Sequence, residues 1–92
     1  MNVRIQFDSQ VRRLAGRSHT SIDVTESDTL KHVIQRVAAQ GTEPLRAALL
    51  DANQEPRVSL LVFMNNELIA ADQLVAWHDG AELTLTTLIS GG

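Results

Sequence analysis

Two glycines, Gly91 and Gly92, end the chain and are the residues with the clearest potential for chemistry. A terminal α-carboxylate becomes reactive when it attacks the α-phosphate of ATP and forms an acyl-adenylate, which carries a good leaving group. Because glycine has no Cβ, such a tail can thread a narrow channel and leave its carbonyl open to attack. The pair therefore predicts a tail that a partner enzyme activates at Gly92. The alternative is an incidental ending, since chain ends are often small and disordered and expression scars can end in glycine.

The interior of the sequence offers no comparable site. His19, His32 and His78 lie far apart and lack the spacing of metal ligands, so we expect surface histidines and no metal site. The sequence has no nucleophile-elbow serine and no glycine-rich phosphate loop, and its acidic residues are dispersed. The absence of cysteine excludes disulfides, zinc–thiolate sites and chemistry by a side-chain thiol.

The excess of acidic over basic residues argues against a nucleic-acid partner. Eight lysines and arginines stand against eleven acidic residues, Lys31 is the single lysine, and the net charge is −3. A nucleic-acid-binding protein needs a basic face, which this balance does not supply. No segment approaches the roughly 18 apolar residues of a membrane span, and the first residues lack the pattern of a signal peptide. We therefore expect no nucleic-acid partner, no membrane partner and a cytoplasmic location.

Alternation of apolar and polar side chains predicts the strands that would position the tail. It marks half-buried strands over residues 2–7, 19–24 and 82–86. The most apolar run is 58–64, and its β-branched and aromatic content favours a strand over a helix. The pair Asn65-Asn66 predicts a hairpin turn into a short return strand at 67–69, and Asp79-Gly80 predicts another turn.

Apolar residues spaced three and four apart over 30–38 predict one main helix. Its N-cap candidates are Ser27, Asp28 and Thr29, and Gly41 is the expected C-cap. A second, shorter helix can begin at 42–44, while residues 8–17 predict a loop or a short helical turn. The buried stripe of the main helix consists of Leu30, Val33, Ile34, Val37 and Ala38.

This order of elements predicts an α+β fold. One main helix cannot cover both faces of a sheet, so the economical architecture is a single mixed sheet packed on that helix. A right-handed crossover would place the first and last strands side by side and parallel, which is the β-grasp, or ubiquitin-like, arrangement. We expect this domain to span 1–89 and a flexible tail to span 90–92, with Ser90 before the glycines. The five residues from Leu88 onward reach at most about 17 Å, enough to enter a neighbouring protein's pocket.

The register of the strand over 58–64 predicts a docking patch. If Val62 faces the helix, Leu61 and Phe63 face the other side of the sheet, together with Thr84 and Thr86. With Leu88 near the tail, these residues would form a surface for a partner protein. The alternative is that Phe63 belongs to the core, because a shift of one residue moves every side chain to the other face.

Two further features have both a functional and a structural interpretation. Trp77 could anchor a partner, but we expect it to pack the connection before the turn at Asp79. Arg12 and Arg13 could pair with an acidic partner, but a solvated run of charge is the favoured interpretation.

Four motifs in order resemble the MoaD/ThiS family of ubiquitin-like sulfur carriers, in particular the small subunit of molybdopterin synthase. They are the segment Gln10–Gly16 after Phe7, the strand and turn Val62–Glu67, the segment Asp79–Leu83, and the terminal Gly91-Gly92. Each motif is weak alone, and the resemblance covers essentially the whole chain. Ala81 replaces the second aspartate of the family's turn, and 85–88 lacks the aromatic and proline residues of many molybdopterin-type members.

The resemblance implies a mechanism in which the catalytic groups belong to partners. A ubiquitin-activating-enzyme-like adenylyltransferase would adenylate Gly92 with ATP and magnesium, which the partner binds and this chain does not. A sulfur donor protein would convert the adenylate to a thiocarboxylate, and a synthase subunit would accept the sulfur. The chain would be a carrier or co-substrate, or the small subunit of a sulfur-transferring complex, and not itself an enzyme. The molybdopterin type is favoured, while 45–51 also resembles carriers that feed cysteine synthesis, and the thiamine type stays open.

Two alternatives from other classes remain. A ubiquitin-like modifier, attached through Gly92 to lysines of target proteins, needs the same tail and the same activation. A β-grasp binding module with an incidental Gly-Gly needs neither.

Overall fold

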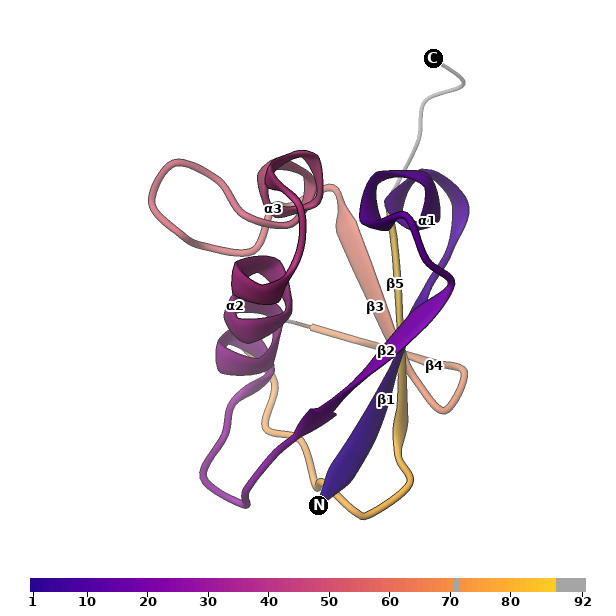
Figure 1. Cartoon of the computed structure of the whole chain (residues 1–92). Helices are drawn as coiled ribbons and strands as arrows, with labels where there is room; N and C mark the ends of the chain where they lie inside the picture. Colours follow the sequence, from indigo (N-terminus) through magenta and orange to yellow (C-terminus); the bar gives the residue numbers. More distant parts are fainter. Residues whose placement is uncertain (71, 88–92) are drawn as a thin grey trace.

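The computed structural model of the chain describes residues 1–70 and 72–87 (Figure 1). All predicted strands and helices are present in the predicted order, and a further short helix precedes the second strand. In chain order the elements are β1 (Asn2–Phe7), α1 (Ser9–Ala15), β2 (His19–Asp23), α2 (Leu30–Gln40), α3 (Glu43–Leu49), β3 (Leu60–Met64), β4 (Glu67–Ile69) and β5 (Glu82–Thr87).

The five strands form one mixed sheet in the order β2-β1-β5-β3-β4. At its centre β1 and β5 run parallel, with Ile5 opposite Leu83 and Phe7 opposite Leu85. The other three pairs are antiparallel. The prediction that the first and last strands lie side by side in parallel is therefore confirmed, and Figure 1 lets the reader follow the indigo and yellow ends of the colour scale into neighbouring strands.

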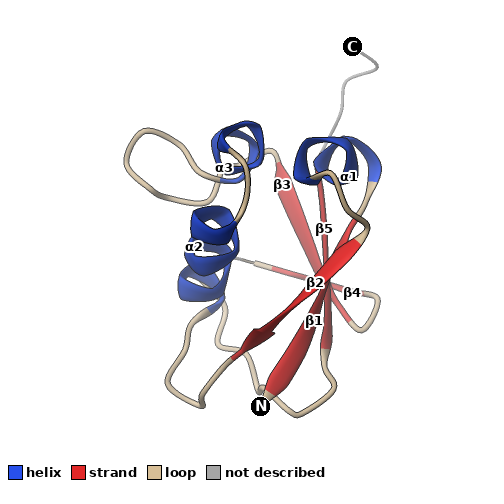
Figure 2. Ribbon diagram, in the orientation of Figure 1, coloured by secondary structure: helices blue, strands red, loops and turns tan. Residues whose placement is uncertain are grey.

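The core lies between this sheet and α2, which Figure 2 shows to one side of the strands. Each fully buried aliphatic or aromatic side chain contributes roughly 1.5–3 kcal/mol from apolar burial alone. The side chains buried in this core include those that the alternation in the strands and the apolar stripe of α2 predicted. The core side chains that are no more than 2 % exposed include Val3, Ile5 and Phe7 of β1, Leu83 and Leu85 of β5, and Leu30, Val33, Ile34, Val37 and Ala38 of α2.

Threonine hydroxyls begin the two helices that follow β2. Thr29 accepts a hydrogen bond from the His32 amide at 3.1 Å and caps α2. Thr42 accepts one from the Leu45 amide at 3.2 Å and caps α3, while its hydroxyl donates to the Leu14 carbonyl at 2.8 Å. Each such cap contributes about 1 kcal/mol. The second Thr42 contact also fixes α3 against the end of α1.

Two sequence-based expectations are settled or corrected by the structure. The segment over 8–17 is a helix, and it ends at Gly16, whose φ of 73° lies in the left-handed region. The prediction that a strand starts at Val58 is wrong, because β3 starts at Leu60. The Leu60 amide donates to the Arg57 carbonyl at 3.0 Å and closes a turn, which leaves Val58 fully exposed.

Gly41 ends α2 as predicted, but for a different physical reason. Its backbone is extended (φ −100°, ψ −171°) and not left-handed, so other residues could adopt it. A Cβ at this position would lie 2.6 Å from Cδ2 of Leu45, whose side chain is 2 % exposed. A larger residue here would therefore force the Leu45 side chain of α3 to move.

We expect Gly41→Ala to destabilise the fold by about 1 kcal/mol, because the added methyl group would push Cδ2 of Leu45 out of its present position. Urea denaturation of the variant measures this loss directly. In a Leu45→Val background, which removes the Cδ atoms, the same alanine should cost markedly less. Additive losses from the two substitutions would contradict the overpacking explanation.

Candidate functional site

The end of β5 fixes the point from which the tail leaves the domain. β5 is hydrogen-bonded on both sides, to β1 and to β3, and its last residue, Thr87, lies opposite Leu60. The Asp8 amide, just before α1, donates to the Leu85 carbonyl at 3.0 Å. The last residues of β5 are therefore held between the start of α1 and the start of β3 (Figure 1).

Asp79 and Gly80 hold the opposite end of β5. The Asp79 carboxylate accepts a hydrogen bond from the Asn2 amide at 2.7 Å, and the Gly80 amide donates to the Asn2 carbonyl at 2.8 Å. Gly80 has a φ of 84°, which favours glycine, and Ala81 is fully buried. The turn that carried part of the sequence resemblance thus sets the register between β1 and β5.

The tail predictions fall outside the described residues. Leu88, Ser90, Gly91 and Gly92 all lie there, and so does the expected boundary between domain and tail at residues 89 and 90. Their roles stay predictions.

The predicted docking patch has the predicted register. Leu61 lies opposite Thr86, and Phe63 lies opposite Thr84, so all four side chains share the face of the sheet that points away from α2. Val62, on the opposite face, is 3 % exposed and belongs to the core. Phe63 is half-buried and not part of that core, so the alternative register, with Phe63 in the interior, is wrong.

Leu68 is a member of this surface that the sequence analysis missed. It lies directly opposite Phe63 in the hairpin and is 58 % exposed. The signal was present, because a two-residue turn at Asn65-Asn66 places Phe63 opposite Leu68 without further information. Both asparagines have positive φ, 50° and 72°, as such a turn requires. We call Leu61, Phe63, Leu68, Thr84 and Thr86 the outer-face patch.

Polar residues border the outer-face patch towards β2. Gln6 lies opposite Thr84, and Arg4 forms an ion pair with Glu82 at 3.8 Å. Both charged side chains are about half exposed (50 % and 48 %), so this pair adds little stability. The arrangement is an apolar centre with a polar margin, which is the composition of a surface that binds another protein.

The other candidate residues occupy structural or solvated positions. His19, His32 and His78 are exposed, as expected. Trp77 is 8 % exposed, and its indole Nε1 donates to the Asp28 carbonyl at 2.8 Å, so it packs the fold and does not project towards a partner. Arg12 and Arg13 are exposed on α1, and neither takes part in an ion pair within the described residues.

Within residues 1–70 and 72–87, no group of three or more acidic or histidine side chains could hold a metal ion. No helix in the described part of the chain is long and apolar enough to cross a membrane.

Solved structures share this arrangement of strands and helices. SAMP1 from Haloferax volcanii superposes with a TM-score of 0.84 over 100 % of both chains, at 21 % sequence identity. The chain has a β-grasp fold. A putative molybdopterin converting factor subunit 1 from Pyrococcus furiosus superposes with a TM-score of 0.72 at 14 % identity, covering 97 % of this chain and 99 % of that one. A chain of the Amycolatopsis orientalis BexX/CysO complex gives 0.66 at 20 % identity, covering 98 % and 99 %.

The likeness is one of structure and not of sequence. No family model matches this sequence, and no curated protein matches it. At these identities the comparisons establish the β-grasp fold alone. They confirm the predicted fold class, and they bear out at that level the resemblance to MoaD/ThiS-type ubiquitin-like proteins.

Proposed function

We propose that this β-grasp protein is a sulfur carrier whose terminal carboxylate, at Gly92, is converted to a thiocarboxylate. One observation carries the proposal. The central strand β5 ends at a fixed point of the sheet, at Thr87, and five residues follow it, of which the last two are Gly91 and Gly92. A rigid domain therefore presents a narrow tail of limited reach, about 17 Å when extended. That geometry suits delivery of one reactive group into an enclosed active site on another protein.

The chemistry proceeds in two steps, both on the tail. The Gly92 carboxylate attacks the α-phosphate of ATP, which breaks the bond to the β-phosphate, releases pyrophosphate and forms the acyl-adenylate. Hydrosulfide (HS⁻) supplied by a donor protein then attacks the carbonyl carbon, AMP leaves with the electron pair of the broken C–O bond, and loss of the proton on sulfur gives the thiocarboxylate. Glycine at both positions leaves the carbonyl accessible to the nucleophile.

The catalytic groups for these steps belong to partners. An adenylyltransferase of the ubiquitin-activating type would bind ATP and magnesium, and a synthase subunit would accept the sulfur. The interior of this domain supports that division, because its three histidines are exposed and its buried side chains are apolar. With no cysteine in the chain, sulfur can be held only as the thiocarboxylate, never as a side-chain persulfide.

The name of one structural neighbour indicates a pathway, and the name of another indicates a complex with a partner protein. One neighbour is described as a subunit of a molybdopterin converting factor, and another belongs to a complex of CysO with BexX. We favour sulfur delivery for molybdopterin synthesis, as the sequence resemblance implied, with delivery to an amino-acid or thiamine precursor as the alternative.

A modifier role is the second candidate, and one comparison favours it specifically. SAMP1, with a TM-score of 0.84, is described as a small archaeal modifier protein. The same adenylate would then react with a lysine amine of a target protein to form an isopeptide bond. Lys31, the single lysine, forms an ion pair with Glu55 at 2.7 Å, so chains linked through this protein's own lysine would first have to break that pair.

Intact mass spectrometry of the protein from its native host separates these roles. Replacement of one oxygen by sulfur at the C-terminus supports the carrier. Gly-Gly remnants joined to lysines of other proteins support the modifier. A terminus that always carries an unmodified carboxylate, together with an absence of conjugates, would contradict both.

The outer-face patch gives a prediction for partner docking. We expect Phe63→Ala to raise the KM of the adenylating enzyme for this protein about tenfold or more, because a half-buried aromatic side chain is a typical interface anchor. The free energy of unfolding should change by less than about 1 kcal/mol, since the side chain lies outside the core. ATP–pyrophosphate exchange and urea denaturation measure the two effects.

Val62→Ala is the matched control, because it removes a neighbouring apolar side chain from the opposite face of β3. It should cost about 2 kcal/mol of stability and leave the KM of the folded protein nearly unchanged. The reverse pattern, with Phe63→Ala unfolding the domain, would show that the patch is structural.

A further inference from the structure

The edge strand β2 has a row of backbone groups that face away from the sheet. Within the described part of the chain, β2 pairs with β1 and with no other strand. The Val24 amide donates to Met1 and the Phe7 amide donates to Ser18, at 2.8 Å each, so the even-numbered residues of β2 face β1. Because hydrogen-bonding direction alternates along a strand, the N–H and C=O groups of His19, Ser21 and Asp23 point to the open edge. Three consecutive pairing positions are thus available to another strand.

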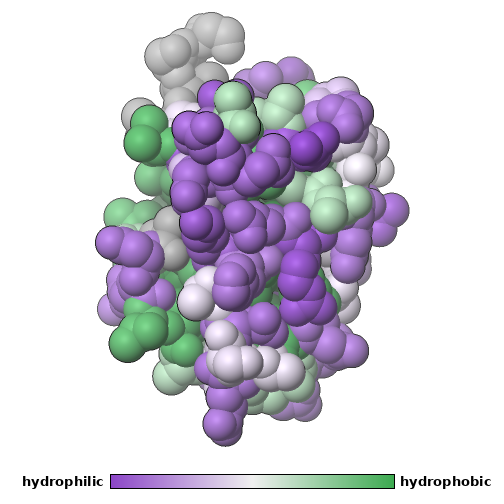
Figure 3. Space-filling model, turned by 90° about the vertical axis from the view of Figure 1, so that its left-hand side faces the viewer, coloured by the Kyte–Doolittle hydropathy of each residue, from purple (hydrophilic) through white to green (hydrophobic). Residues whose placement is uncertain are grey.

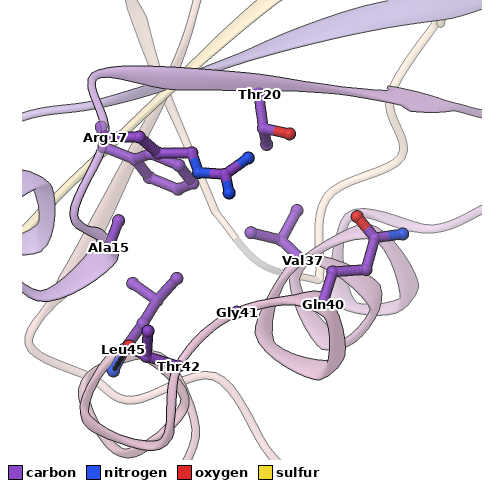
Figure 4. A pocket seen from close by; sticks show the side chains of 9 residues that line it. Ala15, Arg17, Thr20, Val37, Gln40, Gly41, Thr42 and Leu45 are labelled. Atoms are coloured by element: carbon purple, nitrogen blue, oxygen red, sulfur yellow. Dashed lines mark hydrogen bonds between the residues drawn. The ribbon is translucent and has the colours of Figure 1, made fainter.

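A cavity of about 320 Å³ lies beside this edge, between β2 and the ends of α2 and α3. Figure 4 shows Arg17 and Thr20 on one side of it, Val37 and Gln40 on the other, and Leu45 below. Its apolar floor is formed by Val37, Leu45 and Phe7, each 2 % exposed. The volume is far above the ~30 Å³ that one water molecule occupies, so the cavity has room for a side chain.

Among the described residues that line this cavity, Arg17 is the one that carries a charge. The four ion pairs within the described residues use Arg4, Lys31, Arg36 and Arg46, so Arg17 has no carboxylate partner there. The cavity therefore combines an apolar floor with an unpaired guanidinium at its rim. A ligand that fits it brings an aliphatic side chain and a carboxylate.

We propose that β2 and this cavity together bind an extended, acidic segment of a partner protein, which adds a sixth strand antiparallel to β2. Main-chain hydrogen bonds to His19, Ser21 and Asp23 would supply affinity, and the cavity would supply selectivity. Antiparallel pairing is favoured because it is the commoner arrangement and the slightly more stable one per residue.

The pleat of the sheet determines which side chain of that segment enters the cavity. Directly opposite residues of paired strands point to the same face. Thr20 points towards the cavity (Figure 4), so the partner residue opposite Thr20 points there too. Its neighbours opposite His19 and Ser21 point to the other face. A partner residue opposite Ser18 shares the face of Thr20 and lies next to Arg17, where we place the carboxylate.

This surface is separate from the outer-face patch. The patch covers β3, β4 and β5 on the face turned away from α2, whereas the cavity lies on the α2 side beside β2. The proposal therefore does not depend on the tail or on its activation, and two partners could occupy the two surfaces together.

A short synthetic peptide tests the proposal on the full chain. The probe is acetyl-Gln-Val-Thr-Leu-Thr-Glu-amide, which can place its glutamine opposite Asp23, its leucine opposite Thr20 and its glutamate beside Arg17. Titration into the ¹⁵N-labelled protein should give saturable shifts of the His19, Ser21 and Asp23 amides. A version N-methylated at both threonines should not bind, because those two amides face β2 in the proposed register.

Arg17→Glu should weaken binding about fivefold or more, the effect of reversing one charge contact at a solvent-exposed site. Arg4→Glu is the matched control, because it makes the same charge change on the opposite face of the sheet. It should leave the affinity within about twofold.

Three outcomes would overturn the proposal. The first is no saturable binding at millimolar peptide, and the second is binding that shifts Phe63 and Leu68 instead of β2. The third is concentration-dependent shifts of the β2 amides without peptide, which would show that a second copy of the chain occupies this edge.

Discussion

Deletion of Gly92 should abolish formation of the thiocarboxylate while leaving the domain folded. The deletion draws the terminal carboxylate back by one residue, about 3.5 Å along an extended chain. A reacting group misplaced by only 1 Å can already lose about 100-fold in rate, so we expect a loss of at least that size in single-turnover adenylation. Residues 1–87, which include all the described strands and helices, are untouched by the change, so the thermal midpoint should stay the same.

Two further tail variants make this result specific. Gly92→Ala keeps the length of the tail and adds only a methyl group, so its loss reports crowding around the carbonyl and not reach. Ser90→Ala changes neither length nor backbone freedom and should keep nearly full activity. Intact cellular function with the Gly92 deletion as the sole copy would show that the terminal glycine is incidental, and it would remove both the carrier and the modifier proposals together. It would leave the proposed strand-pairing site on β2 unaffected.

The fold could be predicted from sequence because its local signals agree with one another. Val3, Ile5 and Phe7 alternate in a strand that is buried on one face, and the 3.6-residue stripe of α2 faces them. Such patterns depend only on neighbours in sequence. The pairing of β1 with β5 joins residues about 80 positions apart, such as Arg4 with Glu82. It could still be predicted, because crossover connections between parallel strands are almost always right-handed, which restricts the possible strand orders.

Other features depend on contacts that no local pattern contains. The crowding at Gly41 arises from Leu45 Cδ2, which approaches only after α3 has packed on α2. β3 starts at Leu60 because a turn from Arg57 precedes it. The continuous apolar run from Val58 gives no sign of this turn. Arg17 is an ordinary polar residue in the sequence, and only the fold places it at the rim of a cavity.

The candidate site also has parts that could be predicted from the sequence and a part that could not. The tail was visible directly in the sequence, because Gly91 and Gly92 need no tertiary structure to be recognised. The outer-face patch required the register of β3, which the alternation supplied for Leu61 and Phe63. Leu68 lies in a three-residue strand, too short for alternation to be seen, and it became clear only through its pairing with Phe63.

Trp77→Ala should destabilise the domain by about 3–5 kcal/mol, the range measured for removing a large buried aromatic side chain. That is a large part of the 5–15 kcal/mol that holds a typical domain together. Trp77 is 8 % exposed and joins the segment before β5 to the approach to α2 through its hydrogen bond to Asp28. Its loss would therefore loosen both the segment that leads into β5 and the start of the main helix.

Trp77→Phe separates the two contributions of this side chain. Phenylalanine keeps most of the apolar contact but has no donor for the Asp28 carbonyl, so we expect a loss of about 1–2 kcal/mol. Leu74→Ala is the control in the same segment, because Leu74 is 92 % exposed and its truncation should cost less than about 0.5 kcal/mol. Urea midpoints at unchanged m-value give all three free energies. Equal losses for Trp77→Phe and Trp77→Ala would show that the hydrogen bond dominates, and a loss below about 1 kcal/mol for Trp77→Ala would show that the indole is not a core residue.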